Sequence, residues 1–112
     1  MPVAKIANTP AQASAQSGTT HQSFTVSSTA GTLETLGSFT FDSETKHALV
    51  QVNGGGARVT FDGATDPVAA TSGFLIVDGR ECYWPIKLAD NAIIIADSGD
   101  VTVELQELNY KG

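Results

Sequence analysis

Short apolar segments separated by turn-forming residues run through most of this chain, and they constrain its fold more than any other feature. In the clearest segment, Val101, Val103 and Leu105 alternate with polar residues, which is the period of a strand with one buried face. Spacings of roughly 8–12 residues between such segments are typical of sandwiches and barrels. The eight segments that we expect to be strands are Ser23–Ser28, Gly37–Ser43, His47–Asn53, Ala57–Asp62, Gly73–Val77, Arg80–Leu88, Ala92–Ala96 and Asp100–Leu108.

The residues between these segments predict how the strands are connected. Asp78-Gly79 favours a two-residue type I′ turn, so Gly73–Val77 and Arg80–Leu88 are expected to form a hairpin. The glycines of Asn53–Gly56 suit a turn with positive φ. Thr32–Leu36 suits either a helical turn or the start of a strand, of which we favour the strand, and we expect no helix longer than one turn.

The predicted fold class is all-β, an antiparallel β-sandwich, and an eight-stranded jelly roll fits the strand count. A chain of 112 residues has room for one domain. We place the sandwich at residues 21–112. The apolar run Ala92–Ala96 is too short for a helix and predicts a strand that is buried on both faces.

Residues 1–20 form a segment of a different kind, rich in Ala, Ser, Thr and Gln. The segment cannot bury enough apolar surface to offset the entropy of ordering it. We predict an extended N-terminal arm, which is either inconsequential or becomes ordered on a neighbouring subunit. Its candidate contact residues are Pro2, Val3, Lys5, Ile6 and Pro10.

Charge and motif content argue against several function classes. The formal net charge of −6 disfavours nucleic acid or an anionic membrane as the main partner, because phosphate binding needs clustered cations. No stretch approaches the ~20 apolar residues of a membrane-spanning helix, and the N-terminus lacks the apolar run of a signal peptide. The two histidines and Cys82 fall short of a zinc ligand set. We therefore expect no cofactor and no enzymatic activity.

Two local patterns leave alternatives open. The carboxylates of Asp62–Asp66 and Asp97–Asp100 suit turns, and they also offer oxygen ligands to Ca²⁺ without the spacing of an EF-hand. Tyr83 and Trp84, as neighbours on a strand, point to opposite faces. They serve the core, a subunit interface or a sugar site; we keep both as candidate interface residues.

Three segments of the second half resemble short structural proteins of tailed bacteriophages: ARVTFDGATDP (57–67), GFLIVDGRECYWPI (73–86) and NAIIIADSGDVTVELQEL (91–108). The resemblance is one of pattern and covers about half of the chain. It implies a virion protein, a capsid decoration (cement) protein that is made in the host cytoplasm. Such a protein would bind the major capsid protein on the capsid exterior as a homotrimer.

The chain departs from the lambda-type decoration protein, whose motifs are missing. The alternative function is a receptor- or glycan-binding module of a tail fibre or baseplate, which would use Tyr83 or Trp84 and would not need the arm.

Overall fold

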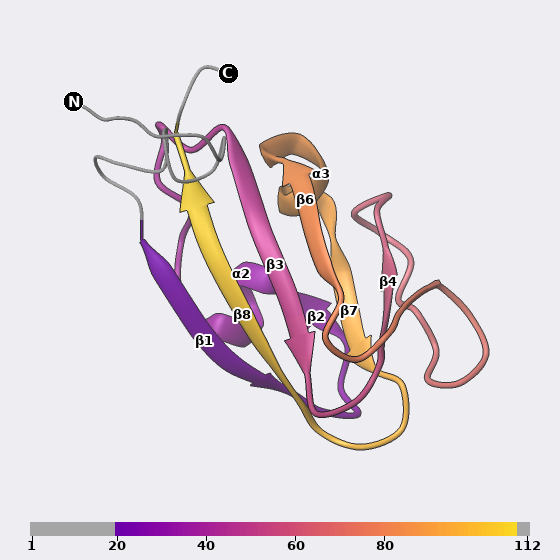
Figure 1. Cartoon of the computed structure of the whole chain (residues 1–112). Coiled ribbons are helices and arrows are strands. Elements are labelled where there is room, and N and C mark those ends of the chain that lie inside the picture. Colours follow the sequence, from indigo (N-terminus) through magenta and orange to yellow (C-terminus); the bar gives the residue numbers. More distant parts are fainter. Residues whose placement is uncertain (1–19, 110–112) are drawn as a thin grey trace.

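The computed structural model describes residues 20–109, in which eight strands form two antiparallel four-stranded sheets (Figure 1). Sheet A has the strand order β1-β8-β3-β6, and sheet B has the order β2-β7-β4-β5. This architecture confirms the predicted all-β antiparallel sandwich. The strands are β1 (His21–Val26), β2 (Gly31–Thr32), β3 (His47–Asn53), β4 (Ala57–Thr60), β5 (Phe74–Ile76), β6 (Glu81–Pro85), β7 (Ile93–Ala96) and β8 (Val101–Leu108).

The strands pair in a nested order. β1 pairs with β8, β2 with β7, β3 with β6 and β4 with β5, always antiparallel. Of the connections between consecutive strands, only the one from β4 to β5 stays within a sheet; every other one crosses to the opposite sheet. β5 and β6 are therefore consecutive in the chain, yet each is the edge strand of a different sheet.

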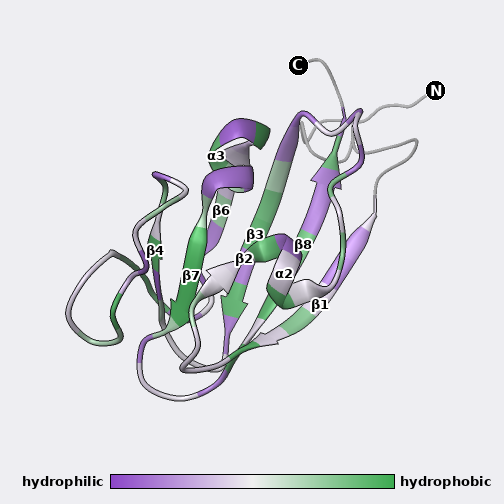
Figure 2. Cartoon of the chain, turned by 180° about the vertical axis from the view of Figure 1, so that it is seen from behind, coloured by the Kyte–Doolittle hydropathy of each residue, from purple (hydrophilic) through white to green (hydrophobic). Residues whose placement is uncertain are grey.

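The core lies between the two sheets and follows the alternation of the sequence. In β3, Ala48, Val50 and Val52 are fully buried while the residues between them are half-buried. β8 alternates in the same way from Val101 to Leu105, whereas all four residues of β7 are buried, as the apolar run predicts (Figure 2). The largest fully buried apolar side chains are Leu33, Ile94, Leu105, Leu108, Val26, Val50, Val52, Val59 and Val103.

The segment Gly37–Ser43 is not a strand, so this prediction is wrong. Its backbone donates hydrogen bonds to two carboxylates instead of to a neighbouring strand: Phe41 N–H to Glu34 Oε2 at 2.8 Å and Asp42 N–H to Glu107 Oε1 at 2.9 Å. Phe39 and Phe41 still reach the core and meet edge to face at 5.1 Å.

The prediction that helices are no longer than one turn is also wrong. Most of Thr32–Leu36 is helical, because α2 (Leu33–Gly37) begins after Thr32, whose hydroxyl accepts a hydrogen bond from Thr35 N–H. α3 (Ile86–Asn91) takes over the end of the predicted strand Arg80–Leu88. It begins directly after Pro85, which has no N–H to donate to a strand ladder.

Asp78-Gly79 forms a turn, but the predicted hairpin is wrong. Only Gly79 has a positive φ, of 82°, and Arg80 N–H donates to Val77 O at 3.1 Å, which matches a type II turn rather than type I′. β5 pairs with β4, and β6 pairs with β3, so the turn joins the two sheets. The position of the turn was predicted correctly, whereas its type and the pairing partners of β5 and β6 were not.

Candidate functional site

A groove opens between β5 and β6, at the side of the sandwich where these two edge strands lie. No strand pairing closes this side, because β5 hydrogen-bonds only to β4 and β6 only to β3. The groove has a volume of about 180 Å³. Its walls come from both sheets and from the turn between them, and the lining residues are Val59, Phe61, Phe74, Leu75, Ile76, Arg80, Cys82 and Trp84.

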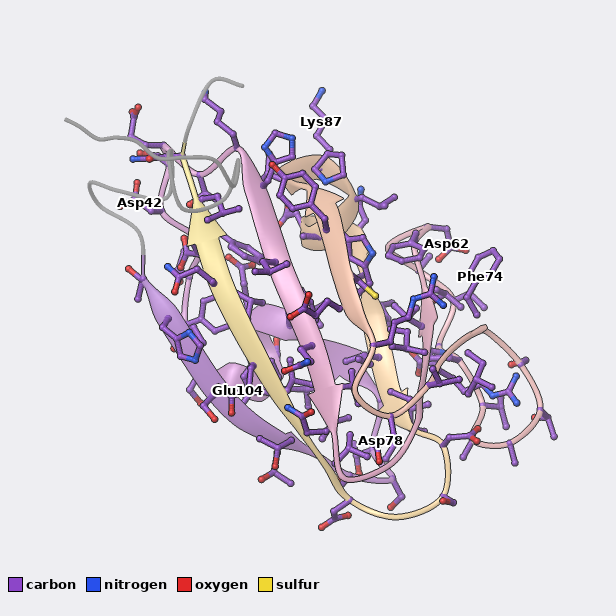
Figure 3. The ribbon with its side chains drawn as sticks, in the orientation of Figure 1. Asp42, Asp62, Phe74, Asp78, Lys87 and Glu104 are labelled. Atoms are coloured by element: carbon purple, nitrogen blue, oxygen red, sulfur yellow. The ribbon has the colours of Figure 1, made fainter. Side chains whose placement is uncertain are left out.

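Three aromatic rings line the groove. Phe61 meets the buried Trp84 edge to face at a centroid distance of 5.1 Å, and its other neighbour, Phe74, lies at 6.1 Å. Phe74 is 70% exposed, the largest value among the exposed large apolar residues. It projects from the side of the molecule opposite β1 (Figure 3). The groove therefore has a fixed aromatic wall and one aromatic side chain that is mostly in water.

Exposed apolar residues continue along β5 and its exit, and Leu75 points to the face opposite Phe74. Leu75 is 48% exposed and Val77 is 49% exposed. Edge strands of monomeric proteins are commonly protected by charges or prolines, and β5 has neither between Phe74 and Val77. An unprotected edge strand that carries several exposed apolar residues is a potential binding surface.

Arg80 and Cys82 give the groove its polar features. Among residues 20–109, the Arg80 guanidinium makes no hydrogen bond or ion pair with another side chain. Burial raises the pKa of the Cys82 thiol, and the nearby positive charge of Arg80 partly opposes this. A half-buried thiol with a raised pKa is mostly protonated at neutral pH, which disfavours it as a nucleophile.

The loop that precedes β5 is held in place by an aspartate turn. Asp62 Oδ1 accepts hydrogen bonds from Ala64 N–H and Thr65 N–H, and the Thr65 hydroxyl donates to Oδ2. These three donors, led by the Thr65 hydroxyl, lower the pKa of Asp62 to about 2. Asp62 is thus a turn former, in agreement with the turn alternative for this cluster.

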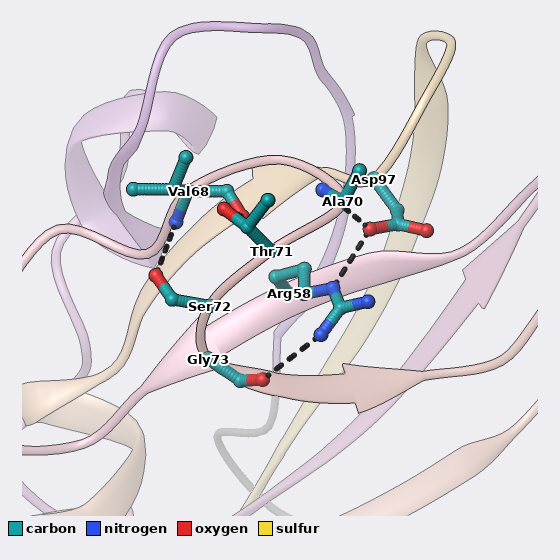
Figure 4. A network of polar contacts seen from close by, with 7 residues as sticks. All are labelled: Arg58, Val68, Ala70, Thr71, Ser72, Gly73 and Asp97. Carbon is teal, nitrogen blue, oxygen red and sulfur yellow. Dashed lines mark hydrogen bonds and ion pairs between the residues drawn. The ribbon is translucent and has the colours of Figure 1, made fainter.

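A second polar network holds the far end of the same loop (Figure 4). Asp97, in the β7–β8 turn, accepts hydrogen bonds from Arg58 Nε at 2.8 Å and from Ala70 N–H at 2.9 Å. Arg58 also donates to Gly73 O at 3.3 Å. The donors to Asp97, Arg58 first, keep the pKa of this carboxyl below its usual value. The network fixes Gly73, and therefore the start of β5.

The candidate interface residues Tyr83 and Trp84 face opposite sides of sheet A. Trp84 is 8% exposed and lines the groove, whereas Tyr83 is 43% exposed and lies on the outer face. The Tyr83 ring stacks on the His47 ring at 4.8 Å. The structure therefore brings only Trp84 to the groove.

The outer face of sheet A is mostly polar beyond Tyr83 and its cross-strand neighbour Leu49. His21 Nε2 and Glu104 Oε1 are hydrogen-bonded at 2.7 Å, and the Ser23 hydroxyl donates to the same carboxylate. These contacts, that of His21 first, lower the pKa of Glu104. The Asn53 amide donates to Gln51 Oε1 two residues earlier on the same strand, β3. This face offers hydrogen-bonding groups in register, with one exposed aromatic ring at its β6 edge.

The arm candidates Pro2, Val3, Lys5, Ile6 and Pro10 lie outside the described residues. Within residues 20–109, no three His, Cys, Asp or Glu side chains lie close enough together to hold a metal ion. In that same part of the chain, no helix has the length and apolar character needed to span a membrane.

Searches against protein-family models, curated proteins and solved structures found no match for this chain. The functional interpretation therefore depends on the groove itself. Of its lining residues, Trp84 was predicted from the sequence as a candidate interface residue, and Cys82 was named only as a possible metal ligand. Phe74, Leu75 and Arg80 were not predicted. An unbroken apolar run in a short strand indicates an exposed edge strand, and this signal would have pointed to Phe74 and Leu75.

Proposed function

We propose that this chain is a non-enzymatic structural domain of a bacteriophage virion, and that it binds other virion proteins through the groove between β5 and β6. The role is that of a capsid decoration protein, which binds the assembled head as a trimer and stabilises it. A protein that binds the assembled shell and not the free subunits shifts the equilibrium toward the shell.

The observation that carries this proposal is the set of exposed apolar residues on and directly after the edge strand β5. Phe74, Leu75 and Val77 are each about half exposed or more. Full burial of such a side chain contributes roughly 1.5–3 kcal/mol, and about half of that remains for one that is already half-buried. Aromatic residues in such a position are typical centres of protein interfaces.

The strand pairing supports the finer fold assignment that we propose, the jelly roll. The nested pairs from β1–β8 to β4–β5 describe one long antiparallel ribbon that is wound so that successive pairs fall alternately in sheet A and sheet B. A double-sheet fold of eight strands with this winding is common in viral capsid proteins and in lectins. The resemblance of residues 57–67, 73–86 and 91–108 to phage structural proteins favours the viral alternative.

The decisive experiment compares Phe74→Ser with Leu88→Ser. Both residues are exposed, but Leu88 lies on α3, outside the groove. We expect the wild type and Leu88→Ser to be trimers in size-exclusion chromatography with light scattering and to co-sediment with heads of the same phage. Phe74→Ser should remain folded and lose both properties. If Phe74→Ser trimerises and binds heads like the wild type, the groove is not the binding surface.

The proposed arm is tested separately. Deleting residues 2–20 should abolish binding to heads and leave the circular dichroism of the sandwich unchanged, because the arm is proposed to contact the major capsid protein. Three linked arms would bind together through their raised effective concentration. Undiminished decoration by the truncated protein would remove the arm from the proposal.

A second candidate function is glycan binding by a tail-fibre or baseplate module. It is favoured by the position of Tyr83, which is exposed beside the polar side chains of the outer face of sheet A. A glycan array and a cell-adsorption assay separate the two functions. A decoration protein gives no signal in either assay, whereas a glycan-binding module gives signals that Tyr83→Ala abolishes.

A further inference from the structure

We infer that the groove between β5 and β6 recognises a segment of a partner protein in which a bulky apolar side chain lies next to a carboxylate. This inference rests on the proposed function and names the chemistry of the partner at the same surface. The apolar side chain would enter between Phe61, Phe74 and Trp84, and the carboxylate would pair with Arg80.

The size and lining of the groove set the first half of this requirement. Its volume is about 180 Å³, and apolar cavities of roughly 150 Å³ hold a benzene ring. One aromatic or branched aliphatic side chain therefore fits. Because the Trp84–Phe61 contact fixes the inner wall while Phe74 is mostly in water, an inserted side chain covers Phe74 without disturbing the core.

The charge of the groove sets the second half. Among the described residues, four cations, Lys46, Arg58, Arg80 and Lys87, stand against 12 carboxylates. Arg58 is paired with Asp97. Arg80 lines the groove and has no such pair within residues 20–109, so it is the cation available to a ligand there. An arginine at the rim of an aromatic groove favours a carboxylate next to the apolar anchor.

Charge complementarity also distinguishes this partner from the N-terminal segment of the chain itself. The apolar anchors of that segment, Val3 and Ile6, flank Lys5, and residues 1–19 contain no carboxylate side chain. A lysine in that position would be repelled by Arg80. The partner that fits is therefore an acidic and apolar segment.

The chain carries two reporters for the test. Trp84 is its only tryptophan and Cys82 is its only cysteine, and both line the groove. The probes are the end-capped tetrapeptide Gly-Leu-Asp-Gly and its counterpart with Asn in place of Asp. We expect both to shift the Trp84 emission and to slow the alkylation of Cys82 by iodoacetamide. The Asp peptide should bind about threefold more tightly, as one exposed ion pair allows.

Two variants of equal charge make the result specific. Arg80→Gln should reduce the ratio of the affinities for the Asp and Asn peptides to about one. Lys87→Gln, which removes a cation from α3, should leave this ratio unchanged. The inference is overturned if wild-type protein binds the two peptides equally, if both variants lose the preference alike, or if neither peptide affects Trp84 and Cys82.

The failure of this inference is distinguishable from the failure of the proposed function. If Phe74→Ser abolishes trimers and head binding but the peptides show no preference for a carboxylate, the groove is an interface with a different occupant, such as a second copy of this chain. If Phe74→Ser changes neither property while the peptides bind as expected, the ligand chemistry stands and the virion role through this groove falls.

Discussion

The indole ring of Trp84 meets the phenyl ring of Phe61 edge to face, with centroids 5.1 Å apart. Trp84 lies on β6 in sheet A, and Phe61 directly follows β4 in sheet B. The contact therefore joins the two sheets at the β5–β6 side of the sandwich, where no strand pairing does so. It forms the inner wall of the groove and closes the core behind it.

Replacing Trp84 should show how much this contact contributes. Trp84→Ala removes a buried aromatic side chain, and we expect a loss of about 3–5 kcal/mol in the free energy of unfolding. Trp84→Phe should lose less, because it keeps a ring opposite Phe61. Tyr83→Ala, on the exposed face of the same strand, should lose about 1 kcal/mol. Urea titrations followed by circular dichroism measure all three, and equal losses for Tyr83→Ala and Trp84→Ala would contradict this assignment.

Three glycines near the groove and in turns allow the effect of backbone strain on stability to be distinguished from the effect of steric crowding. A Cβ at Gly73, where φ is 103°, would lie 2.9 Å from Pro67 Cβ and 3.2 Å from Val59 O. Gly79 also has a positive φ, of 82°, but open space around it, and Gly99 has open space without a positive φ. Left-handed backbone costs an L-residue about 1–2 kcal/mol.

We expect the loss of stability on substitution by Ala to follow the order Gly73→Ala, Gly79→Ala, Gly99→Ala, with the last close to zero. Thermal unfolding by calorimetry gives the order. Because Gly73 directly precedes Phe74, Gly73→Ala should also displace β5 and alter the emission of Trp84. A loss for Gly99→Ala as large as that for Gly73→Ala would show that neither φ nor contact with Pro67 controls the effect.

The strands that the sequence predicted most directly are those whose burial leaves a local pattern, either an alternation with one face in water or an apolar run that is buried on both faces. β8 and β3 were found from alternation alone, and β7 from an unbroken apolar run. Phe39 and Phe41 alternate just as regularly without forming a strand. Their segment is held by the carboxylates of Glu34 and Glu107, and Glu107 is 65 residues from its partner Asp42. A contact of that separation leaves no local pattern.

The groove could not be predicted from the sequence for a related reason. Asp78-Gly79 indicates a turn, but the turn does not indicate which strands β5 and β6 pair with. Had they paired with each other, Phe74 and Trp84 would belong to one sheet, and no open side would lie between them. The groove therefore depends on the topology, which places β5 and β6 at neighbouring edges of different sheets and brings lining residues from the range 59–84 together. The alternation of Tyr83 and Trp84 was predictable, because it depends only on the strand period.

Glu107 should prove a strong local determinant of stability. It is 2% exposed and accepts hydrogen bonds from the Thr45 hydroxyl at 2.6 Å and from Asp42 N–H at 2.9 Å. Glu107→Ala leaves these donors without an acceptor, so we expect a loss of roughly 2–3 kcal/mol. Glu107→Gln keeps an acceptor oxygen and should lose less. Hydrogen exchange of the Asp42 amide reports the contact directly, and unchanged protection in Glu107→Ala would contradict it.

The Arg58–Asp97 pair should make the stability of the protein depend on pH in the acidic range. The pKa of Asp97 is lowered because Arg58 and Ala70 N–H donate to its carboxylate. The unfolded chain therefore takes up this proton at a higher pH than the folded chain does. The stabilisation is complete above the unfolded pKa of about 4, and it is lost as the pH falls through the lower folded pKa.

Asp97→Asn removes this titration, so its unfolding midpoint in urea should be lower than that of the wild type at pH 7 and approach it at pH 3. Arg58→Gln should give a similarly flattened pH profile, and the double variant should resemble either single one, because both act on one contact. A residual slope should persist in all three, since the lowered pKa values of Asp62 and Glu104 act elsewhere in the molecule. If the difference in unfolding midpoint between Asp97→Asn and the wild type were constant from pH 7 to pH 3, the carboxylate would not be stabilising the loop through its charge.

The double variant gives a second test. Additive losses of stability in it would show that Arg58 acts mainly through Gly73, its other partner in the network.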